Sequence, residues 1–244
     1  MPELDALKNI IAASDNIVFF GGAGVSTESD IPDFRGPQGL YKSKTIYGEI
    51  PETLLSYSFF QDNPEKFFRF HLNEMIFPEA KPNAAHHALA RLEHQGKLKT
   101  IITQNIDGLH QLAGSHQVIE LHGSVLRNYC MNCGLKYDVS FMLDHKKTIP
   151  HCRDCGGIVR PDVVLYEERL NTQVLRDAQK AIALADVLIV GGTSLVVYPA
   201  AGLVRDFRGQ KLVLINKSAT DYDRNADLII RENISHALNY AIPI

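Results

Sequence analysis

Short apolar runs recur along the chain, and each is a candidate for a buried β-strand. Asn16–Phe20 ends in a glycine turn, and six similar runs follow at Thr100–Thr103, Val118–Leu121, Val163–Tyr166, Val187–Val190, Leu212–Ile215 and Leu228–Ile230. Several of these runs lack polar alternation, which is typical of parallel strands that are covered on both faces. The pattern therefore predicts a parallel sheet.

Segments with a helical spacing of apolar residues lie between these runs. Thr172–Leu184 carries its apolar side chains on one face, at Val174, Leu175, Ala178, Ala181 and Ile182. Comparable segments are Leu4–Ser14, Asn83–His94, Tyr198–Phe207 and Ser235–Ile242. Strands that alternate with helices in this way indicate an α/β fold.

Two stretches do not follow this alternation. Residues 36–82 contain aromatic and polar helices such as Pro64–Met75, and residues 127–157 contain the cysteines and few core residues. We expect these two insertions to form a smaller domain beside the sheet. The larger domain would then comprise residues 1–35, 83–126 and 158–244, and a ligand would bind in the cleft between the two domains.

Charge and composition exclude some classes of protein. The chain has 244 residues, of which 45% are hydrophobic, and a formal net charge of −3, whereas nucleic-acid-binding domains are usually strongly basic. No apolar run approaches the roughly 20 residues that cross a bilayer. The polar start, Met1 to Lys8, does not resemble a secretory signal. We expect a cytoplasmic protein that binds neither membranes nor nucleic acid directly.

The four cysteines form two C-x-x-C pairs, Cys130 with Cys133 and Cys152 with Cys155. The two pairs are separated by 18 residues. In an intracellular chain this spacing is typical of a zinc site rather than of disulfides. Four thiolates complete a tetrahedral Zn²⁺ site and leave no position for water. The sequence therefore predicts one structural zinc per chain.

The turn Gly22-Ala23-Gly24 follows the first predicted strand. Glycines at such a position let backbone N–H groups approach a phosphate. The third glycine of the dehydrogenase motif is absent, since Thr27 stands there, and no acidic residue follows about 20 positions later to hold a ribose. A hydride-transferring enzyme is poorly supported, and a glycine turn without a ligand stays open at this point.

Polar residues also follow the other predicted strands, where ligands bind in α/β folds. Gln104, Asn105 and Asp107 offer donors and acceptors that suit a carboxamide and sugar hydroxyls. His122 is a candidate general base, and Arg35 can contact a phosphate. The alternatives are an Asx-rich turn and a structural histidine.

Taken together, these motifs resemble those of the sirtuins. The family pattern G-A-G-x-S-x-x-S-G-I-P-D-F-R-G matches Gly22–Gly36 except that Asp30 replaces a glycine, T-Q-N-x-D-x-L-H matches Thr103–His110, and L-H-G matches Leu121–Gly123. The resemblance extends from about Leu4 to Ile242. The compact chain is similar to bacterial members.

The resemblance implies a Rossmann-like NAD-binding domain with a smaller domain formed by a helical insertion and a zinc ribbon. It implies that His122 is catalytic and that NAD is a co-substrate. The NAD contacts it implies are Gly22, Ala23, Gly24, Ser26, Thr27, Asp33, Phe34, Arg35, Gln104, Asn105, Ile106, Asp107, Gly192, Thr193, Ser194 and Asn216.

Gly157–Glu168 resembles the family's substrate segment, R-P-x-V-V-x-F-G-E, which pairs with the substrate backbone. The resemblance implies that Val164, Leu165 and Tyr166 contact an acyl-lysine, while Glu167 replaces a glycine. Sirtuins that prefer acidic acyl groups carry Tyr-x-x-Arg where this chain has Phe68 and His71. We therefore expect acetyl and longer apolar acyl groups to be preferred over acidic ones.

The implied activity is deacylation of protein lysine, with release of nicotinamide and O-acyl-ADP-ribose. One alternative is a protein ADP-ribosyltransferase, which needs NAD but no acyl-lysine. The other is a non-catalytic NAD-sensing or zinc-ribbon interaction module, which would be indifferent to His122→Ala.

Overall fold

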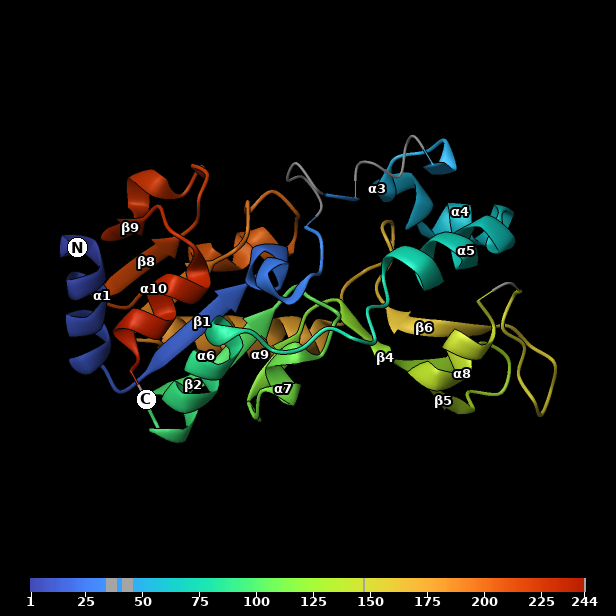
Figure 1. The fold of residues 1–244 in the computed structure, drawn as a ribbon, viewed down its shortest axis with the longest axis horizontal. Coiled ribbons are helices and arrows are strands. Elements are labelled where there is room, and N and C mark those ends of the chain that lie inside the picture. Colours follow the sequence, from blue (N-terminus) through green and yellow to red (C-terminus); the bar gives the residue numbers. More distant parts are fainter. Residues whose placement is uncertain (34–38, 41–45, 147, 244) are drawn as a thin grey trace.

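A six-stranded parallel sheet forms the centre of the larger part of the molecule in the computed structural model, which describes residues 1–33, 39–40, 46–146 and 148–243 (Figure 1). The strand order is β3-β2-β1-β7-β8-β9. The strands are β1 (Ile17–Gly21), β2 (Leu98–Thr103), β3 (Val118–Glu120), β7 (Val187–Gly191), β8 (Lys211–Ile215) and β9 (Leu228–Ile230). The predicted Rossmann-like α/β fold is confirmed.

Helices cover both faces of this sheet. Ile17 and Phe19 of β1 pack in a cluster with the helices α1 (Pro2–Ala12), α6 (Ala84–His94) and α10 (Ile234–Ala241). Val18 and Phe20 point to the opposite cluster, which contains α9 (Thr172–Leu184) and the 3₁₀ helix η4 (Ala200–Asp206). Because both faces are buried, β1 has no polar alternation.

The smaller part is built around a three-stranded antiparallel sheet of order β5-β4-β6. Its strands are β4 (Gly123–Cys130), β5 (Lys136–Asp138) and β6 (Val159–Val163), and its helices are α3 (Pro51–Leu54), α4 (Tyr57–Asp62), α5 (Pro64–Glu74) and α8 (Val139–Asp144). Aromatic side chains of α4 and α5, among them Phe60 and Phe67, share one core with Met142 and Val159. The two insertions therefore stabilise each other.

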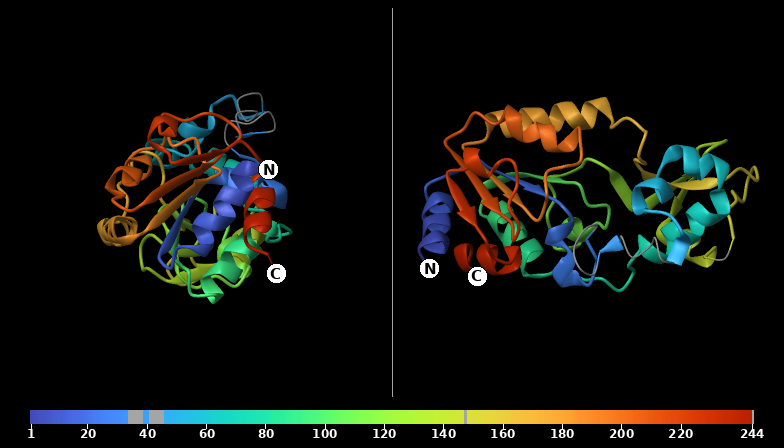
Figure 2. Two further views of the ribbon diagram at one scale, coloured as in Figure 1. Left: turned by 90° about the vertical axis from the view of Figure 1, so that its left-hand side faces the viewer. Right: turned by 90° about the horizontal axis from the view of Figure 1, so that it is seen from above.

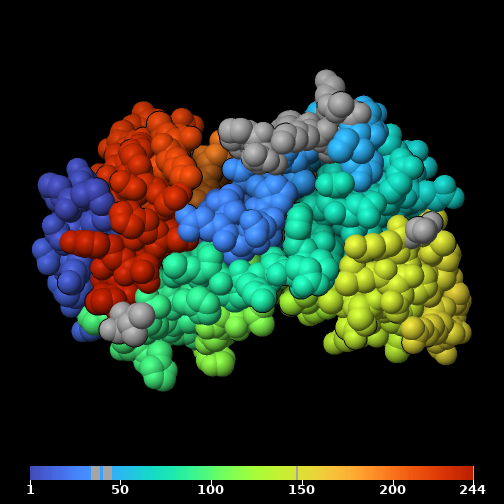
Figure 3. Space-filling view, in the orientation of Figure 1, coloured from blue at the N-terminus to red at the C-terminus, as the bar shows by residue number. Residues whose placement is uncertain are grey.

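The smaller part lies at the end of the molecule away from both termini (Figure 2). In the space-filling view, the helical insertion (cyan) and residues 127–157 (yellow) together form that end (Figure 3). Within the described ranges, no helix is both long and apolar enough to span a bilayer.

One predicted strand was wrong, because Val163–Tyr166 does not join the parallel sheet. β6 ends at Val163, which pairs antiparallel with Gly123 of β4. Residues 164–166 continue between the two parts: the Val164 N–H donates to the His122 carbonyl at 3.0 Å, and the Tyr166 N–H donates to the Leu55 carbonyl at 3.0 Å. An apolar run predicts burial, and burial between two parts looks the same in sequence as burial within a sheet.

Candidate active site

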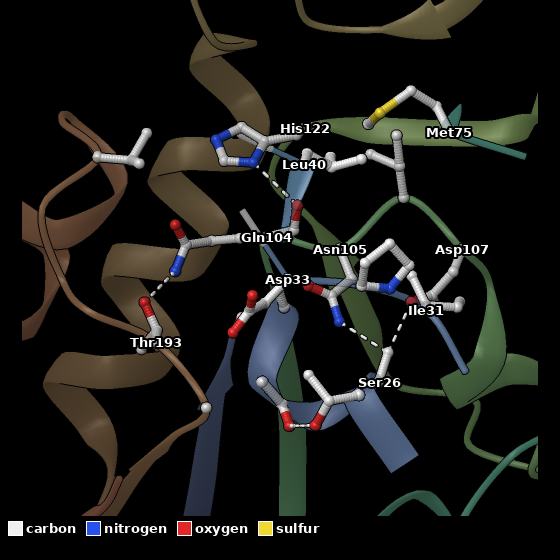
Figure 4. A pocket seen from close by; sticks show the side chains of 18 of the residues that line it. Ser26, Ile31, Asp33, Leu40, Met75, Gln104, Asn105, Asp107, His122 and Thr193 are labelled. Carbon is white, nitrogen blue, oxygen red and sulfur yellow. Dashed lines mark hydrogen bonds between the residues drawn. The ribbon is translucent and has the colours of Figure 1, made fainter. Parts of the chain in front are cut away.

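A cleft of ≈ 1140 Å³ opens at the carboxyl ends of β1, β2, β7 and β8. The sheet contributes the polar part of its wall, including Gln104, Thr193 and Asn216. The smaller part contributes apolar residues such as Leu55 and Met75. The cleft therefore offers a polar side and an apolar side to whatever binds there (Figure 4).

The glycine turn after β1 packs against the turn after β7. The Gly24 N–H donates to the Gly192 carbonyl at 2.8 Å, and a Cβ atom on Gly24 would lie only 2.7 Å from the Gly192 Cα atom. Gly22 faces Thr193 equally closely, since a Cβ atom on Gly22 would lie 2.8 Å from the Thr193 Cβ atom. Both glycines are thus required by the contact between two turns, and this contact brings both turns to the edge of the cleft.

A partly buried polar cluster is formed by Ser26, Asn105 and Asp107 (Figure 4). The Ser26 hydroxyl donates to Asp107 Oδ2 at 2.7 Å and accepts a hydrogen bond from Asn105 Nδ2 at 3.0 Å. The Leu109 N–H donates to Asp107 Oδ1 at 2.9 Å. Burial raises the pKa of Asp107, while the bonds from Leu109 and Ser26 act in the opposite direction. These hydrogen bonds fix the three predicted side chains relative to one another in the wall of the cleft.

His122 lies between β3 and β4 with its ring held in one orientation. Its Nδ1 atom is 2.9 Å from the Gln104 carbonyl oxygen (Figure 4). Because a carbonyl oxygen only accepts, Nδ1 carries the hydrogen, and Nε2 is the basic nitrogen. Burial lowers the pKa of His122 from its ordinary value of 6.5, and the Gln104 carbonyl partly offsets that shift. The imidazole is therefore mainly neutral at pH 7 and able to accept a proton.

A chain of hydrogen bonds joins the ends of β2, β7 and β8 through Gln104, Thr193 and Asn216. Gln104 Nε2 donates to Thr193 Oγ1 at 3.0 Å. The Thr193 N–H donates to Asn216 Oδ1 at 3.0 Å, and Asn216 Nδ2 donates to the Thr193 carbonyl at 2.9 Å. This chain of hydrogen bonds gives the polar wall a fixed geometry.

The structure brings most of the predicted residues to this cleft. Its wall includes Gly22, Ala23, Gly24, Ser26, Thr27, Asp33, Gln104, Asn105, Ile106, Asp107, His122, Val164, Leu165, Tyr166, Gly192, Thr193, Ser194 and Asn216. Phe34 and Arg35 lie outside the described residues. Sequence reasoning did not select Lys217, Ser218, Thr220 or Glu232, which also line the cleft. Lys217, Ser218 and Thr220 lie in the turn that follows β8. Their position after a strand end is the signal in the sequence that could have identified them as cleft residues.

The segment 164–166 crosses the cleft as a fixed strap. Besides the bonds to His122 and Leu55, the Tyr166 carbonyl accepts from the Tyr57 N–H at 3.0 Å. The carboxylate of Glu168 accepts from the Leu165 N–H at 2.8 Å and pairs with Arg160 at 2.8 and 2.9 Å. The strap is therefore anchored to both parts of the molecule.

Asp30 and Glu167, which occupy the two glycine positions of the family pattern, both have positive φ values, of 62° and 76°. The Glu167 carboxylate accepts hydrogen bonds from the Ser58 N–H at 2.8 Å and the Ser58 hydroxyl at 2.9 Å. Asp is among the residues that tolerate this conformation, whereas Glu167 adopts it while anchored to the start of α4. The replacement thus adds a bond between the strap and the helical insertion.

The four cysteine Sγ atoms lie within 4.8 Å of one another. Cys130 and Cys155 are 3.4 Å apart at Sγ, and Cys133 and Cys152 are 3.6 Å apart. A tetrahedral zinc with Zn–S bonds of about 2.3 Å would place its sulfur ligands roughly 3.8 Å apart. The four thiolates therefore fit one structural Zn²⁺, as the spacing predicted.

A comparison with known protein families identifies the family of this chain. A model of the Sir2 family matches residues 22–199, which is more than half of the chain. The chain belongs to the Sir2 family. The predicted sirtuin membership is thereby confirmed, and the matched region contains the glycine turn, His122 and all four cysteines.

This sirtuin is similar to its relatives over nearly their whole length. It is 60% identical over 242 residues to an NAD-dependent protein deacetylase of Clostridium acetobutylicum, covering 99% of each chain. Identity is also 60% over 232 residues to one of Clostridium tetani, covering 95% of this chain and 94% of the other. A solved structure of Sir2 with a p53 peptide and NAD⁺ is 40% identical, with a TM-score of 0.84 and coverage of 97% and 95%.

Proposed function

We propose that this sirtuin is an NAD-dependent protein-lysine deacylase that releases nicotinamide and O-acyl-ADP-ribose. The observation that carries the proposal is the position of His122. Its side chain is bonded to Gln104 on the polar wall, and its backbone carbonyl is bonded to Val164 of the strap. One histidine thus links a surface suited to a dinucleotide with one suited to an acyl-lysine, and the relatives named as NAD-dependent deacetylases support the same activity.

Each wall of the cleft binds one of the two substrates. We assign NAD to the polar wall, formed by the glycine turn, the Ser26 cluster and the residues that follow β7 and β8; Phe34 and Arg35 complete this set. We assign the acyl-lysine to Val164, Leu165 and Tyr166. These assignments are supported by donor and acceptor chemistry on one wall and by the partly buried, largely apolar strap on the other.

His122 acts as the general base in this scheme. The acyl oxygen first bonds to the ribose anomeric carbon as nicotinamide leaves. Nε2 then accepts a proton from a ribose hydroxyl, whose oxygen attacks the carbon of the acyl group. Water completes the reaction, so that free lysine and O-acyl-ADP-ribose are released. The Gln104 carbonyl, which accepts the Nδ1 hydrogen, holds the ring in the required tautomer and stabilises the cation that forms. Zinc takes no part in these steps, because four thiolates complete its coordination.

The pH dependence follows from the neutral state of His122. Only the unprotonated imidazole can accept a proton, and burial lowers its pKa below 6.5. We expect kcat/KM to rise with pH through an apparent pKa below 6.5 and to stay level near pH 7. A profile of kcat/KM between pH 5 and pH 8, at constant ionic strength, checks this expectation. A rise centred well above pH 7 would show that another group is the base.

Glu167→Gly tests the anchoring of the strap. The variant loses two hydrogen bonds to Ser58, while relief of the positive φ offsets part of that loss. With a net hydrogen bond worth about 1 kcal/mol, we expect KM for the acyl peptide to rise roughly threefold to tenfold. KM for NAD should change little, since the polar wall is untouched. Glu167→Gln, which keeps an acceptor, is the matched control; an equal rise in both KM values would contradict this account.

The proposed activity is tested by nicotinamide release. The protein is incubated with NAD and either an acetyl-lysine peptide or its unmodified counterpart, and both nicotinamide and peptide mass are measured. A deacylase releases nicotinamide only with the acetylated peptide and lowers its mass by one acetyl group. An ADP-ribosyltransferase instead adds mass to the unmodified peptide, and a non-catalytic module releases no nicotinamide with either.

We also propose acylated proteins of the cytoplasm as partners. Zinc binding by four thiolates requires that the cysteines stay reduced, as they do in that compartment. We further propose the division into a larger domain (1–35, 83–126 and 158–244) and a smaller one (36–82 and 127–157), where β4 and β6 connect the two and pair in the sheet of the smaller part. It is supported by the separate core that the residues of both insertions share.

A further inference from the structure

Asn83 lies at the start of α6 and does not itself line the cleft. Its side-chain oxygen Oδ1 accepts a hydrogen bond from the Ala85 N–H at 2.9 Å, as expected of a residue that caps a helix. Its backbone N–H donates to Nδ1 of His86 at 3.2 Å, which completes a capping box. This capping role uses only the oxygen of the side-chain amide. The amide nitrogen Nδ2 is left for other contacts.

The Asn83 amide nitrogen donates to segment 22–29, which contains the glycine turn after β1. Nδ2 is 2.8 Å from the Val25 carbonyl oxygen and 3.0 Å from the Ser29 hydroxyl oxygen. Val25 is 0% exposed and Ser29 is 5% exposed. Because both acceptors are buried, the loss of this donor costs more than the loss of a hydrogen bond at the surface. Asn83 therefore fixes segment 22–29 to the start of α6.

The same side chain also contacts the start of α10. The Ser235 hydroxyl, on a residue that is 3% exposed, donates to Asn83 Oδ1 at 3.2 Å. The residue before it, Ile234, lines the cleft, as do Gly24 and Ser26 of segment 22–29. One amide group thus connects two parts of the cleft wall that lie far apart in the sequence.

We propose that Asn83 is a positioning residue for NAD, which holds segment 22–29 and the start of α10 in the arrangement that binds the dinucleotide. On the cleft side, Gly24 is bonded to Gly192 and Ser26 to Asp107. Asn83 supplies the contacts on the other side of the segment. A segment that is not held beforehand must be ordered when the ligand binds, and this lowers the affinity. The inference rests on the proposed function, which assigns NAD to this wall.

Asn83→Ser tests the proposal, because serine still caps a helix but has no amide nitrogen. We expect the Kd for NAD, measured by calorimetry, to rise roughly fivefold to thirtyfold, which corresponds to one or two net hydrogen bonds. The KM for NAD should rise in parallel. At saturating NAD, kcat and the KM for an acetyl-lysine peptide should stay close to those of wild type. A general loss of stability would not produce this division between KM and kcat.

Asn171→Ser is the matched control. Asn171 caps α9 through hydrogen bonds from the Gln173 and Val174 N–H groups at 2.8 and 3.2 Å, and it does not line the cleft. Its replacement changes a helix cap in the same way, so the Kd for NAD should not change. Ser29→Ala is the second variant, since it leaves the cap of α6 intact and removes one of the two acceptors of Nδ2. It should raise the Kd for NAD by a smaller factor, roughly twofold to fivefold.

The inference is overturned if Asn83→Ser binds NAD as tightly as wild type, or if Asn171→Ser weakens binding equally. If Asn83→Ser does not fold, Ser29→Ala decides the question, and an unchanged Kd in that variant overturns the inference. If the wild-type protein itself binds no NAD, the proposed function fails, which is a different result from equal Kd values in wild type and variant.

Discussion

His122→Ala is expected to lower kcat/KM for deacylation by about 10²- to 10⁴-fold, the usual contribution of a general base. The variant removes the proton acceptor and leaves the polar wall intact, because Gln104 keeps its bond to Thr193. NAD should therefore still bind. Initial rates with an acetyl-lysine peptide, together with an NAD-binding isotherm, measure the two effects separately.

The matched control for this variant is His116→Ala. His116 is exposed, and its backbone N–H rather than its side chain bonds to Glu93. Its replacement should leave kcat/KM close to that of wild type. If His122→Ala keeps most of the activity, His122 is not the base. Another group of the cleft would then have to accept the proton.

Removal of zinc is expected to unfold the smaller part of the molecule. Structural zinc sites contribute apparent binding free energies of about 10–16 kcal/mol, and that energy stabilises the fold around them. β4 carries Cys130 and pairs with β6, which leads directly into the strap. Loss of the metal should thus abolish deacylation even though zinc has no catalytic role.

Hydrogen exchange after chelation, or in Cys152→Ser, measures the extent of this unfolding. We expect the amides of β4, β5 and β6 to lose protection, while those of β1 and β7 keep it. Met131→Ala, in the same C-x-x-C turn but with an exposed side chain, is the control and should retain zinc. Stoichiometric zinc loss without a change in exchange or activity would contradict this prediction.

The local pattern of apolar residues predicted the sheet well, because the burial of each strand is visible within its own segment of the sequence. β1 and β7 are buried at every position, so their sequences contain no polar residue. The metal cluster was equally predictable, since two C-x-x-C turns need only meet to complete it. The Ser26 cluster joins residues 81 positions apart, and Ser26 entered the predicted site only through the family pattern.

The strap could not be placed from sequence alone. Its apolar residues suit a central strand, and only the pairing of Gly123 with Val163 and of Ser56 with Tyr166 puts it between the two parts. The bond from Glu167 to Ser58 likewise spans 109 positions. These contacts depend on where the helical insertion lies in the folded molecule. The pattern of apolar residues within 164–166 contains no information about that position.

The most direct test of the central claim follows the acyl group itself. A peptide with ¹³C-labelled acetyl-lysine is incubated with NAD, and the nucleotide products are identified by mass. If His122 acts where ribose and acyl-lysine meet, the labelled acetyl group should be found on ADP-ribose, in equal amount to the nicotinamide released. Labelled free acetate as the first product, or ADP-ribose attached to the peptide, would contradict this account.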